Sequence, residues 1–215
     1  MLADQDHRWD LEGTITHGTD ISQINDLVAS DHLVTKNNDP LYVSSDAGLG
    51  NRVVAQCDQS NTESLADFAF ATSTPEPYTV YAIFTVDTLA ASSVHGIWAD
   101  SSNGIGLYVN QGEGFTMTGV TNSRTATTTT VVVNTAYLVI TVFDFEAEQM
   151  YVNNTAQTLG GTSCDGNDLV EMDIPNDPSA NWGDVSWTLA GVIGSAMSSG
   201  DRTSLYNWAV ANCGV

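Results

Sequence analysis

Short runs of apolar, β-branched and aromatic residues separated by polar turns recur along this chain, and the clearest is the segment 136–143, which reads AYLVITVF. Apolar residues fill both alternating sets there, which is typical of a strand that lies between two covered surfaces. A polar turn is expected at 144–148 and a second strand at 149–152. Asn153 and Asn154 follow, and asparagine tolerates the positive φ that a tight hairpin return needs. This pattern predicts an all-β fold.

Several other segments read as strands. The strongest is 78–86, which is rich in β-branched and aromatic residues at period two and is expected to be central in its sheet. The run 125–133 is rich in threonine and valine, whose branched side chains favour an extended chain. The remaining expected strands, separated by turn sequences, are 52–56, 64–70, 94–99, 104–109, 114–120, 169–174 and 185–193.

One short helix is expected at the end of the chain, over 201–213. Leu205, Trp208, Ala209 and Cys213 recur there at helical spacing. Ser199 and Asp201 are candidate N-terminal caps, and Gly214 is placed to end the helix.

The chain has 215 residues, of which 42% are hydrophobic, and this is enough for one well-packed core. We expect a single domain over 41–215. Residues 1–40 are polar and mixed, so they are expected to form an N-terminal arm.

The charge balance narrows the choice of partner. Five lysines and arginines stand against 26 aspartates and glutamates, which gives a formal net charge of -21. Such a surface repels phosphate backbones and anionic headgroups, so nucleic acid and membrane surfaces are poor partners. Two explanations of the acidity stay open: solubility through mutual repulsion, or adaptation to salty water, where charges are screened.

The start of the chain lacks the basic and apolar regions of a secretory signal peptide, and no apolar run is long enough to span a bilayer. We therefore expect a protein made in the cytoplasm. The three cysteines, Cys57, Cys164 and Cys213, form an odd and widely spaced set, which predicts buried free thiols. One bridge, for example between Cys164 and Cys213, is left open.

The segment from Tyr137 to Asp144, followed by Met150 to Asn154, resembles the paired strands of laminin G-like and concanavalin A-like domains. The glycine-led strand at 104–109 and the terminal helix extend the resemblance from about residue 40 to the C-terminus. The resemblance implies a two-sheet antiparallel jelly-roll sandwich with a short C-terminal helix.

The sequence Glu171-Met-Asp-Ile-Pro-Asn176 is similar to the carboxylate signature of laminarinase-type glycoside hydrolases, which share this fold. In that family the first Glu is the nucleophile, the Asp assists, and a final Glu is the acid and base. Here Asn176 holds the final position, and an amide cannot donate a proton at a useful pKa. The catalytic pair is therefore incomplete unless Asp177 supplies the acid. We expect no enzymatic activity, with Glu171 and Asp173 on a solvated acidic loop.

Calcium is the one cofactor left open, because Asp165, Asn167 and Asp168 offer oxygen ligands in a Gly- and Asp-rich segment. Their spacing fits no calcium-loop template.

Sandwich lectins usually bind sugar through an exposed tryptophan, whose ring stacks against the apolar face of a pyranose. Trp182, on a predicted loop beside Asp184, is the first candidate, and Trp98 is the second. Trp187 alternates with apolar neighbours and is expected in the core. For Trp98, which closes an apolar strand, a place in the core is the open alternative.

Three functions follow from the resemblance. The first is a non-enzymatic virion surface protein, of the capsid-decoration or tail-fibre type found in phages, that stabilises a capsid or adheres to a host surface. Its partners would be other virion proteins or a cell-surface glycan, it would form a homo-oligomer, and residues 1–40 would dock or clasp a neighbour. The alternatives are a lectin-like carbohydrate-binding module and a laminarinase-like hydrolase.

Overall fold

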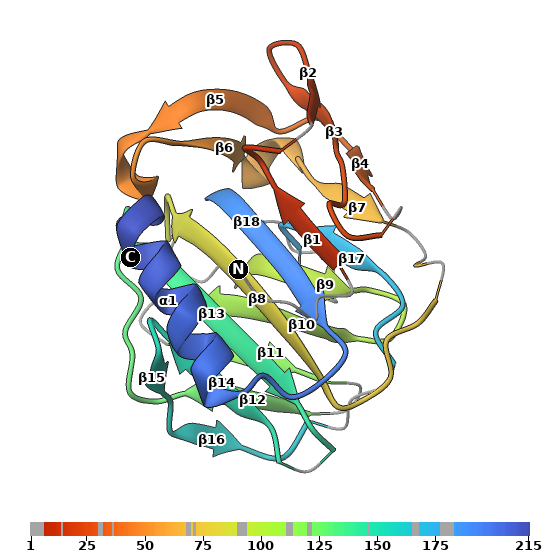
Figure 1. Ribbon diagram of the computed structural model, residues 1–215, viewed down its shortest axis with the longest axis vertical. Coiled ribbons are helices and arrows are strands. Elements are labelled where there is room, and N and C mark those ends of the chain that lie inside the picture. Colours follow the sequence, from red (N-terminus) through yellow and green to blue (C-terminus); the bar gives the residue numbers. More distant parts are fainter. Residues whose placement is uncertain are drawn as a thin grey trace.

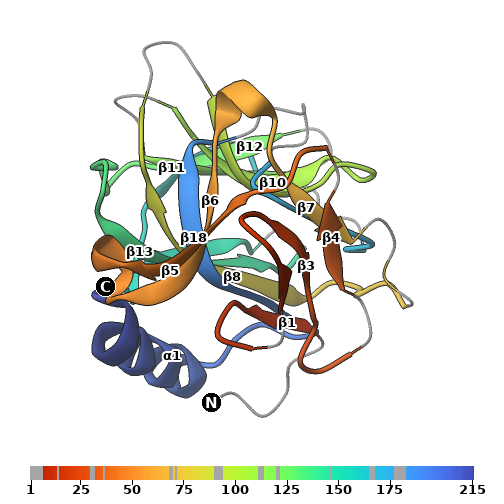
Figure 2. The same ribbon diagram turned by 90° about the horizontal axis from the view of Figure 1, so that it is seen from above.

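The structure is a computed structural model. It describes residues 7–13, 15–29, 32–35, 37–67, 70, 72–89, 94–110, 114–119, 122–145, 147–164, 168–176 and 183–215. Two antiparallel sheets pack face to face, and one helix lies on the outer side of the first sheet (Figures 1 and 2). The expected all-β sandwich with a C-terminal helix is confirmed.

Sheet A has eight strands, and the order of its main path is β15-β14-β13-β8-β18-β6-β5, with β1 pairing to β18. The strands are β1 (His7–Asp10), β5 (Leu41–Asp46), β6 (Arg52–Cys57), β8 (Tyr78–Val86), β13 (Ala136–Phe143), β14 (Gln149–Val152), β15 (Thr155–Ala156) and β18 (Val185–Ile193). The expected central position of 78–86 is confirmed.

Sheet B has ten strands, in the order β16-β12-β11-β10-β9-β17-β7-β4-β3-β2. The strands are β2 (Ile15–His17), β3 (Ile21–Ile24), β4 (Leu33–Thr35), β7 (Leu65–Asp67), β9 (Val94–Asp100), β10 (Ile105–Asn110), β11 (Phe115–Thr118), β12 (Ser123–Ala126), β16 (Leu159–Gly161) and β17 (Met172–Ile174). The remaining elements are the 3-10 turns η1 (Ala47–Leu49) and η2 (Gln59–Asn61) and the helix α1 (Ser199–Cys213).

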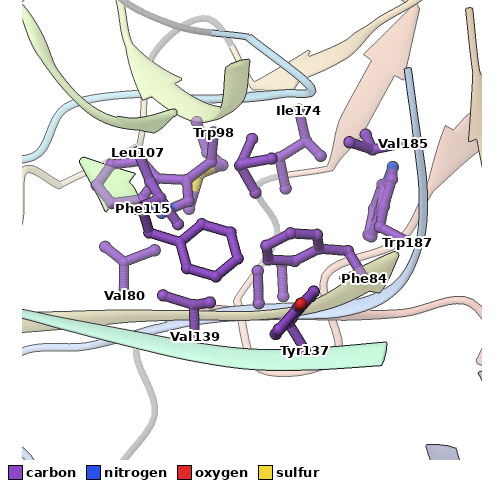
Figure 3. Packing of buried hydrophobic residues seen from close by; sticks show 14 of the residues in the cluster. Val80, Phe84, Trp98, Leu107, Phe115, Tyr137, Val139, Ile174, Val185 and Trp187 are labelled. Carbon is purple, nitrogen blue, oxygen red and sulfur yellow. The ribbon is translucent and has the colours of Figure 1, made fainter. Parts of the chain in front are cut away.

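The main core fills the space between the two sheets (Figure 3). Phe84 of β8 and Tyr137 of β13 both contact Phe115 of β11, with ring centroids 5.8 and 5.2 Å apart in edge-on arrangements. Trp187 of β18 is buried in the same cluster, as its apolar neighbours predicted. Aromatic side chains from both layers therefore interlock across the sandwich.

A second core lies between sheet A and α1. On β13, Leu138 and Ile140 face the helix, whereas Tyr137 and Val139 face sheet B. Helix residues Leu205, Ala209 and Cys213 cover the outward set. This arrangement explains why the segment 136–143 is apolar on both faces, and it confirms that prediction.

The helix begins and ends at capping residues. The Ser198 hydroxyl accepts a hydrogen bond from the Asp201 backbone N–H, and Gly214 ends the helix at a φ of 71°. The expected terminator is confirmed, while the cap is Ser198 rather than Ser199 or Asp201. The Asn153-Asn154 return is also confirmed, with φ values of 48° and 64° between β14 and β15.

The polar arm expected over residues 1–40 is wrong for the part that the structure describes. Residues 7–10 form β1 and pair with β18, and three further strands, β2 to β4, extend sheet B. Trp9, Ile24 and Leu33 are fully buried in the main core. Their wide spacing among polar residues hides this burial, because each short strand contributes only one or two apolar side chains.

Some other strands were predicted at the right place but with bounds that are too wide. The strand expected at 169–174 shortens to β17, and only the start of the run 125–133 lies in a strand, β12. Of the strand expected at 64–70, β7 covers 65–67, and residues 68 and 69 lie outside the described residues. Cys57, Cys164 and Cys213 are buried free thiols, as expected. No helix in the described part of the chain has the length and apolar character needed to cross a bilayer.

Candidate functional site

The tryptophans do not form a sugar-stacking surface among the described residues. Trp98 of β9 is 1% exposed and packs edge-on against Phe143, with ring centroids 6.1 Å apart. The expected ligand-binding role of Trp98 is therefore wrong, because its ring is buried in the main core. Trp182 lies outside the described residues.

The hydrolase-like segment is buried, which corrects the expected solvated loop. Glu171, Asp173 and Asn176 are 7%, 1% and 1% exposed, because β17 lies inside sheet B between β9 and β7. The Asn176 amide donates to Asp173 Oδ2 at 2.5 Å, and Glu171 Oε1 accepts from the Ser102 backbone N–H at 2.9 Å.

Asp100 joins this segment from the end of β9. Its carboxylate accepts from the backbone N–H groups of Asn103 and Val170, at 2.9 and 2.8 Å. Burial raises the pKa of Asp100 above its ordinary value, and the nearby Glu171 carboxylate acts in the same direction. These hydrogen bonds of Asp100 and Glu171 link the 101–104 turn to the segment that leads into β17.

The calcium candidates stay a prediction. Asp165 and Asn167 lie outside the described residues, whereas Asp168 Oδ2 accepts from the Ser73 hydroxyl at 3.2 Å. Where the chain is described, no three histidine, cysteine, aspartate or glutamate side chains come together in a way that could hold a metal ion.

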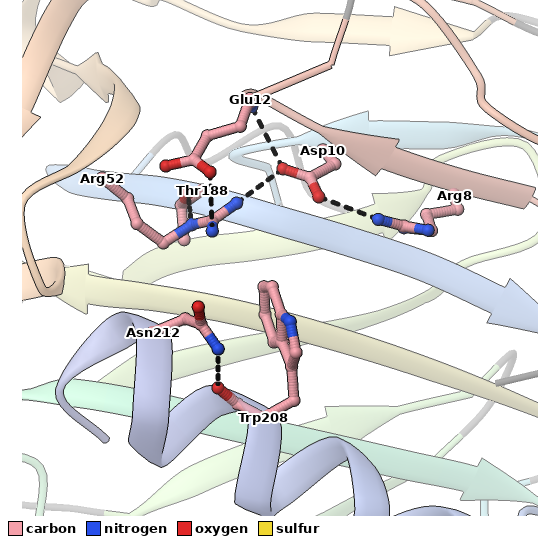
Figure 4. Close-up of polar contacts among 7 residues, drawn as sticks. All are labelled: Arg8, Asp10, Glu12, Arg52, Thr188, Trp208 and Asn212. Atoms are coloured by element: carbon pink, nitrogen blue, oxygen red, sulfur yellow. Dashed lines mark hydrogen bonds and ion pairs between the residues drawn. The ribbon is translucent and has the colours of Figure 1, made fainter. Parts of the chain in front are cut away.

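A cluster of ion pairs surrounds the buried Arg52 side chain, where β6 and β1 share one edge of β18 (Figure 4). Arg52 Nη2 binds Asp10 Oδ1 at 2.7 Å, its Nη1 lies 3.0 Å from Glu12 Oε2, and its Nε donates to the Thr188 hydroxyl at 3.1 Å. The guanidinium also lies 4.9 Å from the Trp208 ring centroid, which belongs to α1. Because these donors of Arg52 are occupied inside the protein, the cluster links β1, β6 and β18 to α1.

An open pocket lies at the end of sheet A where β6 and β8 end and β18 begins. Its volume is about 540 Å³. We call it the acidic pocket, because five of its lining side chains are carboxylates: Asp20, Asp58, Glu63, Asp87 and Asp184. Leu41, Gln56, Cys57, Asn61 and Thr88 complete the lining.

Local hydrogen bonds fix the carboxylates of the acidic pocket. Asp184 Oδ1 accepts from the Gln59 backbone N–H at 2.6 Å, and its Oδ2 accepts from the Thr88 hydroxyl. Asp87 accepts from the hydroxyls of Thr85 and Ser186, at 2.8 and 2.7 Å. These carboxylates are therefore positioned before any ligand arrives.

The acidic pocket carries charge of one sign only, since its lining includes no lysine, arginine or histidine. Burial raises the pKa of Asp87 above its ordinary value, although hydrogen bonds from Ser186 and Thr85 oppose the shift. Burial also raises the pKa of the Cys57 thiol well above its ordinary value, helped by Glu63 and Asp87. Cys57 thus stays a thiol and is no nucleophile. The lining can accept hydrogen bonds from hydroxyl or ammonium groups.

Sequence reasoning found Asp184 but missed the other four carboxylates of the acidic pocket. A usable signal was present, because Asp58 and Asp87 directly follow two strands and Asp184 directly precedes a third. In the antiparallel sheet these three strand ends meet at one edge, where Val185 pairs with both Cys57 and Val86. The order of the strands, which the sequence does not reveal, was needed to see this.

The chain matches no protein-family model, and no curated protein sequence matches it. Solved structures do share its fold. The receptor-binding domain of botulinum neurotoxin type G aligns with a TM-score of 0.65 at 9% identity, over 96% of this chain and 51% of that chain. The serotype D binding domain aligns with a TM-score of 0.63 at 8% identity, over 95% and 52%.

A Trypanosoma rangeli sialidase in complex with 2,3-difluorosialic acid aligns with a TM-score of 0.61 at 13% identity, over 96% of this chain and 33% of that chain. The chain therefore spans about half of the toxin domains and a third of the sialidase. Such low identities show similarity of fold alone. The chain is thus a two-sheet β-sandwich of the kind also present in these sialidase and toxin structures.

Proposed function

We propose that this protein is a non-catalytic binding module that holds a hydroxyl-rich ligand, a carbohydrate, in the acidic pocket. The observation that supports it most is an open pocket of about 540 Å³ whose lining is dominated by fixed hydrogen-bond acceptors. Sugar hydroxyls are donors that such carboxylates bind. The similar structures include toxin receptor-binding domains and a sialidase in complex with sialic acid, so the fold occurs in ligand-binding proteins.

The charge of the pocket restricts the sugar. Five carboxylates with no basic neighbour in the lining disfavour a ligand that carries its own carboxylate, since like charges at close range repel. Neutral sugars and amino sugars carry no such penalty, and an ammonium group adds an attraction. We expect binding of neutral or amino-sugar glycans in this pocket.

The contacts of the hydrolase-like segment support a non-catalytic role. Retaining hydrolysis needs a proton-donating carboxyl across the sugar bond from the nucleophile. Asn176 occupies the position of that acid and donates to Asp173, while Glu171 is 7% exposed and accepts from the Ser102 N–H. We expect no reducing-sugar release from β-glucan.

A glycan array read with the wild-type chain and with Asp184→Asn and Asp87→Asn tests the proposal. Both substitutions keep the shape but remove charge and acceptors, so binding to neutral or amino-sugar glycans should fall at least about tenfold. Asp144→Asn, in the β13–β14 turn outside the lining, is the matched control and should bind as the wild type does. Unchanged binding by both pocket variants, or no binding to any glycan, would overturn the proposal.

The role at a virion surface, expected from the sequence resemblance, stays a prediction. A glycan-binding module of this kind would serve host adhesion, with other virion proteins as its neighbours and a homo-oligomer as its assembly. Labelling purified particles with an antibody against this chain checks the location. Particles without surface label would count against it.

A further inference from the structure

A second cavity lies at the β14–β15 edge of sheet A, away from the acidic pocket. It has a volume of about 240 Å³ and lies where β14 and β15 of sheet A meet β12 and β16 of sheet B. Arg124, Glu148, Gln149, Tyr151 and Gln157 supply its polar lining. We call it the arginine cavity.

The charge pair in this cavity is asymmetric in exposure. Arg124 Nη1 lies 3.1 Å from Glu148 Oε2, and the Ser163 hydroxyl donates to Glu148 Oε1 at 2.6 Å. The Glu148 side chain is 0% exposed, whereas that of Arg124 is 24% exposed. The Arg124 side chain is therefore the accessible member of the pair, while the Glu148 carboxylate is buried with both oxygens engaged.

Hydrogen-bond donors in the arginine cavity are left unused. The Nε–H of Arg124 is buried and has no hydrogen-bond partner. Buried donors in proteins almost always have a partner, so an unpaired one needs an explanation. The exposed Gln149 accepts from the Tyr151 hydroxyl through its amide oxygen, which leaves its amide N–H groups as donors.

A second positive charge stands beside the same tyrosine. The guanidinium of Arg202, on α1, lies 3.8 Å from the centroid of the Tyr151 ring, and its Nε donates to Asn154 Oδ1 at 3.1 Å. Among the described residues Arg202 forms no ion pair with a carboxylate, unlike Arg8 and Arg52, which bind Asp10. In a chain of net charge -21, this edge gathers two of the five basic residues.

We propose that the arginine cavity is a second ligand site that binds the carboxylate of a sugar acid. Arg124, whose side chain is the accessible member of its pair with Glu148, would receive the carboxylate, since arginine offers several N–H donors to anions. Gln149 and Tyr151 would bind ring hydroxyls, and the volume suits one monosaccharide. The site is separate from the acidic pocket and prefers the opposite ligand charge.

Calorimetric titration of the intact chain with glucuronate, glucose and inorganic phosphate tests this proposal. Glucuronate and glucose differ by the carboxylate, so glucuronate should bind at least about tenfold more tightly. Equal affinity for the two sugars would overturn the proposal. Phosphate binding as tight as that of glucuronate would also overturn it, because it would show an anion site that does not recognise sugar.

Variants separate the cavity from general charge effects. Arg124→Gln with Glu148→Gln replaces the pair by neutral amides of similar shape and should abolish glucuronate binding. Arg8→Gln removes a positive charge outside the cavity lining and should bind as the wild type does. Asp184→Asn should also leave glucuronate binding unchanged, which keeps this test independent of the acidic pocket. A folded double variant that still binds glucuronate would overturn the proposal.

Discussion

Arg52 shows how a single buried charge can hold three elements together. It starts β6, binds Asp10 at the end of β1, and lies against Trp208 of α1. Its side chain is 6% exposed, and that of Asp10 is 8% exposed. A buried pair gives little net stability over an apolar one, but removing one partner leaves the other buried and uncompensated.

Replacing Arg52 with alanine should therefore lower the free energy of unfolding by about 3–5 kcal/mol. The matched control is Glu12→Gln, because Glu12 binds the same guanidinium but is 47% exposed. Ion pairs that water can reach contribute about 1 kcal/mol or less. Urea denaturation measures both changes, and equal losses for the two variants would contradict this account.

Asp26 gives an acid-sensitive contribution to stability. Burial raises its pKa, but hydrogen bonds from the His7 side chain and from the N–H groups of Arg8 and Val28 outweigh burial and lower it below 3.8. A lowered folded-state pKa means that the unfolded state binds the proton more tightly. This stabilisation is present above 3.8 and is lost as the pH falls through the lowered pKa.

We expect the unfolding free energy of Asp26→Asn to depend less on pH than that of the wild type below about pH 4. Asp87 has a raised pKa, so its contribution has the opposite sign: stability falls as the pH rises from 3.8 through the raised value. Urea midpoints of the two variants across this acid range should therefore deviate from wild type in opposite directions. Parallel profiles for all three proteins would count against the assignment.

At the scale of elements, the side chains along the strands of sheet A point alternately toward sheet B and toward α1, so both faces of the sheet are covered. A bulge in β18 between Trp187 and Leu189 changes the phase of that alternation. Trp187 then faces sheet B, whereas Leu189 faces α1. Without the bulge, both side chains would point to the same face.

The helix cover can be tested with two adjacent residues. Ala209 is fully buried against sheet A, whereas Val210 is 46% exposed. Ala209→Glu would place an unpaired charge in that interface and should destabilise the protein by about 3 kcal/mol or more. Val210→Glu should change stability by about 0.5 kcal/mol or less. Thermal melts followed by circular dichroism compare them, and similar melting temperatures would contradict the packing of α1.

Long regular segments could be predicted from the sequence, and short ones could not. Alternation over 78–86, 136–143 and 185–193 placed β8, β13 and β18 at their observed bounds. The four strands within residues 7–35 are only three or four residues long, so local alternation carries too little signal. The ligand-binding role given to Trp98 was wrong because the residues that enclose its ring, such as Phe143, lie far from it in the sequence.

The candidate site was predictable only in part for the same reason. Asp184 was found because it stands at the end of a loop, whereas Asp20 and Glu63 enter the acidic pocket from segments far apart in sequence. The arginine cavity was missed altogether. Arg124 and Tyr151 come together only because the two sheets meet at this edge.

For the whole molecule, the net charge of -21 acts against the compact state. Folding brings like charges closer together, and dissolved salt screens their repulsion, with a Debye length of about 10 Å at about 0.1 M and about 3 Å at about 1 M. The two explanations of this acidity, solubility and adaptation to salty water, differ in how strongly stability should depend on salt.

We expect the melting temperature to rise as sodium chloride increases from about 0.05 M to about 1 M. A charge-balanced β-sandwich of similar size, measured in parallel, should change less. A melting temperature that stays flat or falls with salt would contradict self-repulsion and leave solubility as the explanation of the acidic composition.

The most direct test of the proposed function is a crystal structure of the intact chain soaked with a neutral or amino-sugar oligosaccharide that binds it on the array. We expect density for the sugar in the acidic pocket, with hydroxyl or ammonium groups within hydrogen-bond distance of Asp184 and Asp87. Sugar bound elsewhere, with the acidic pocket holding only solvent, would contradict the assignment of this pocket as the ligand site.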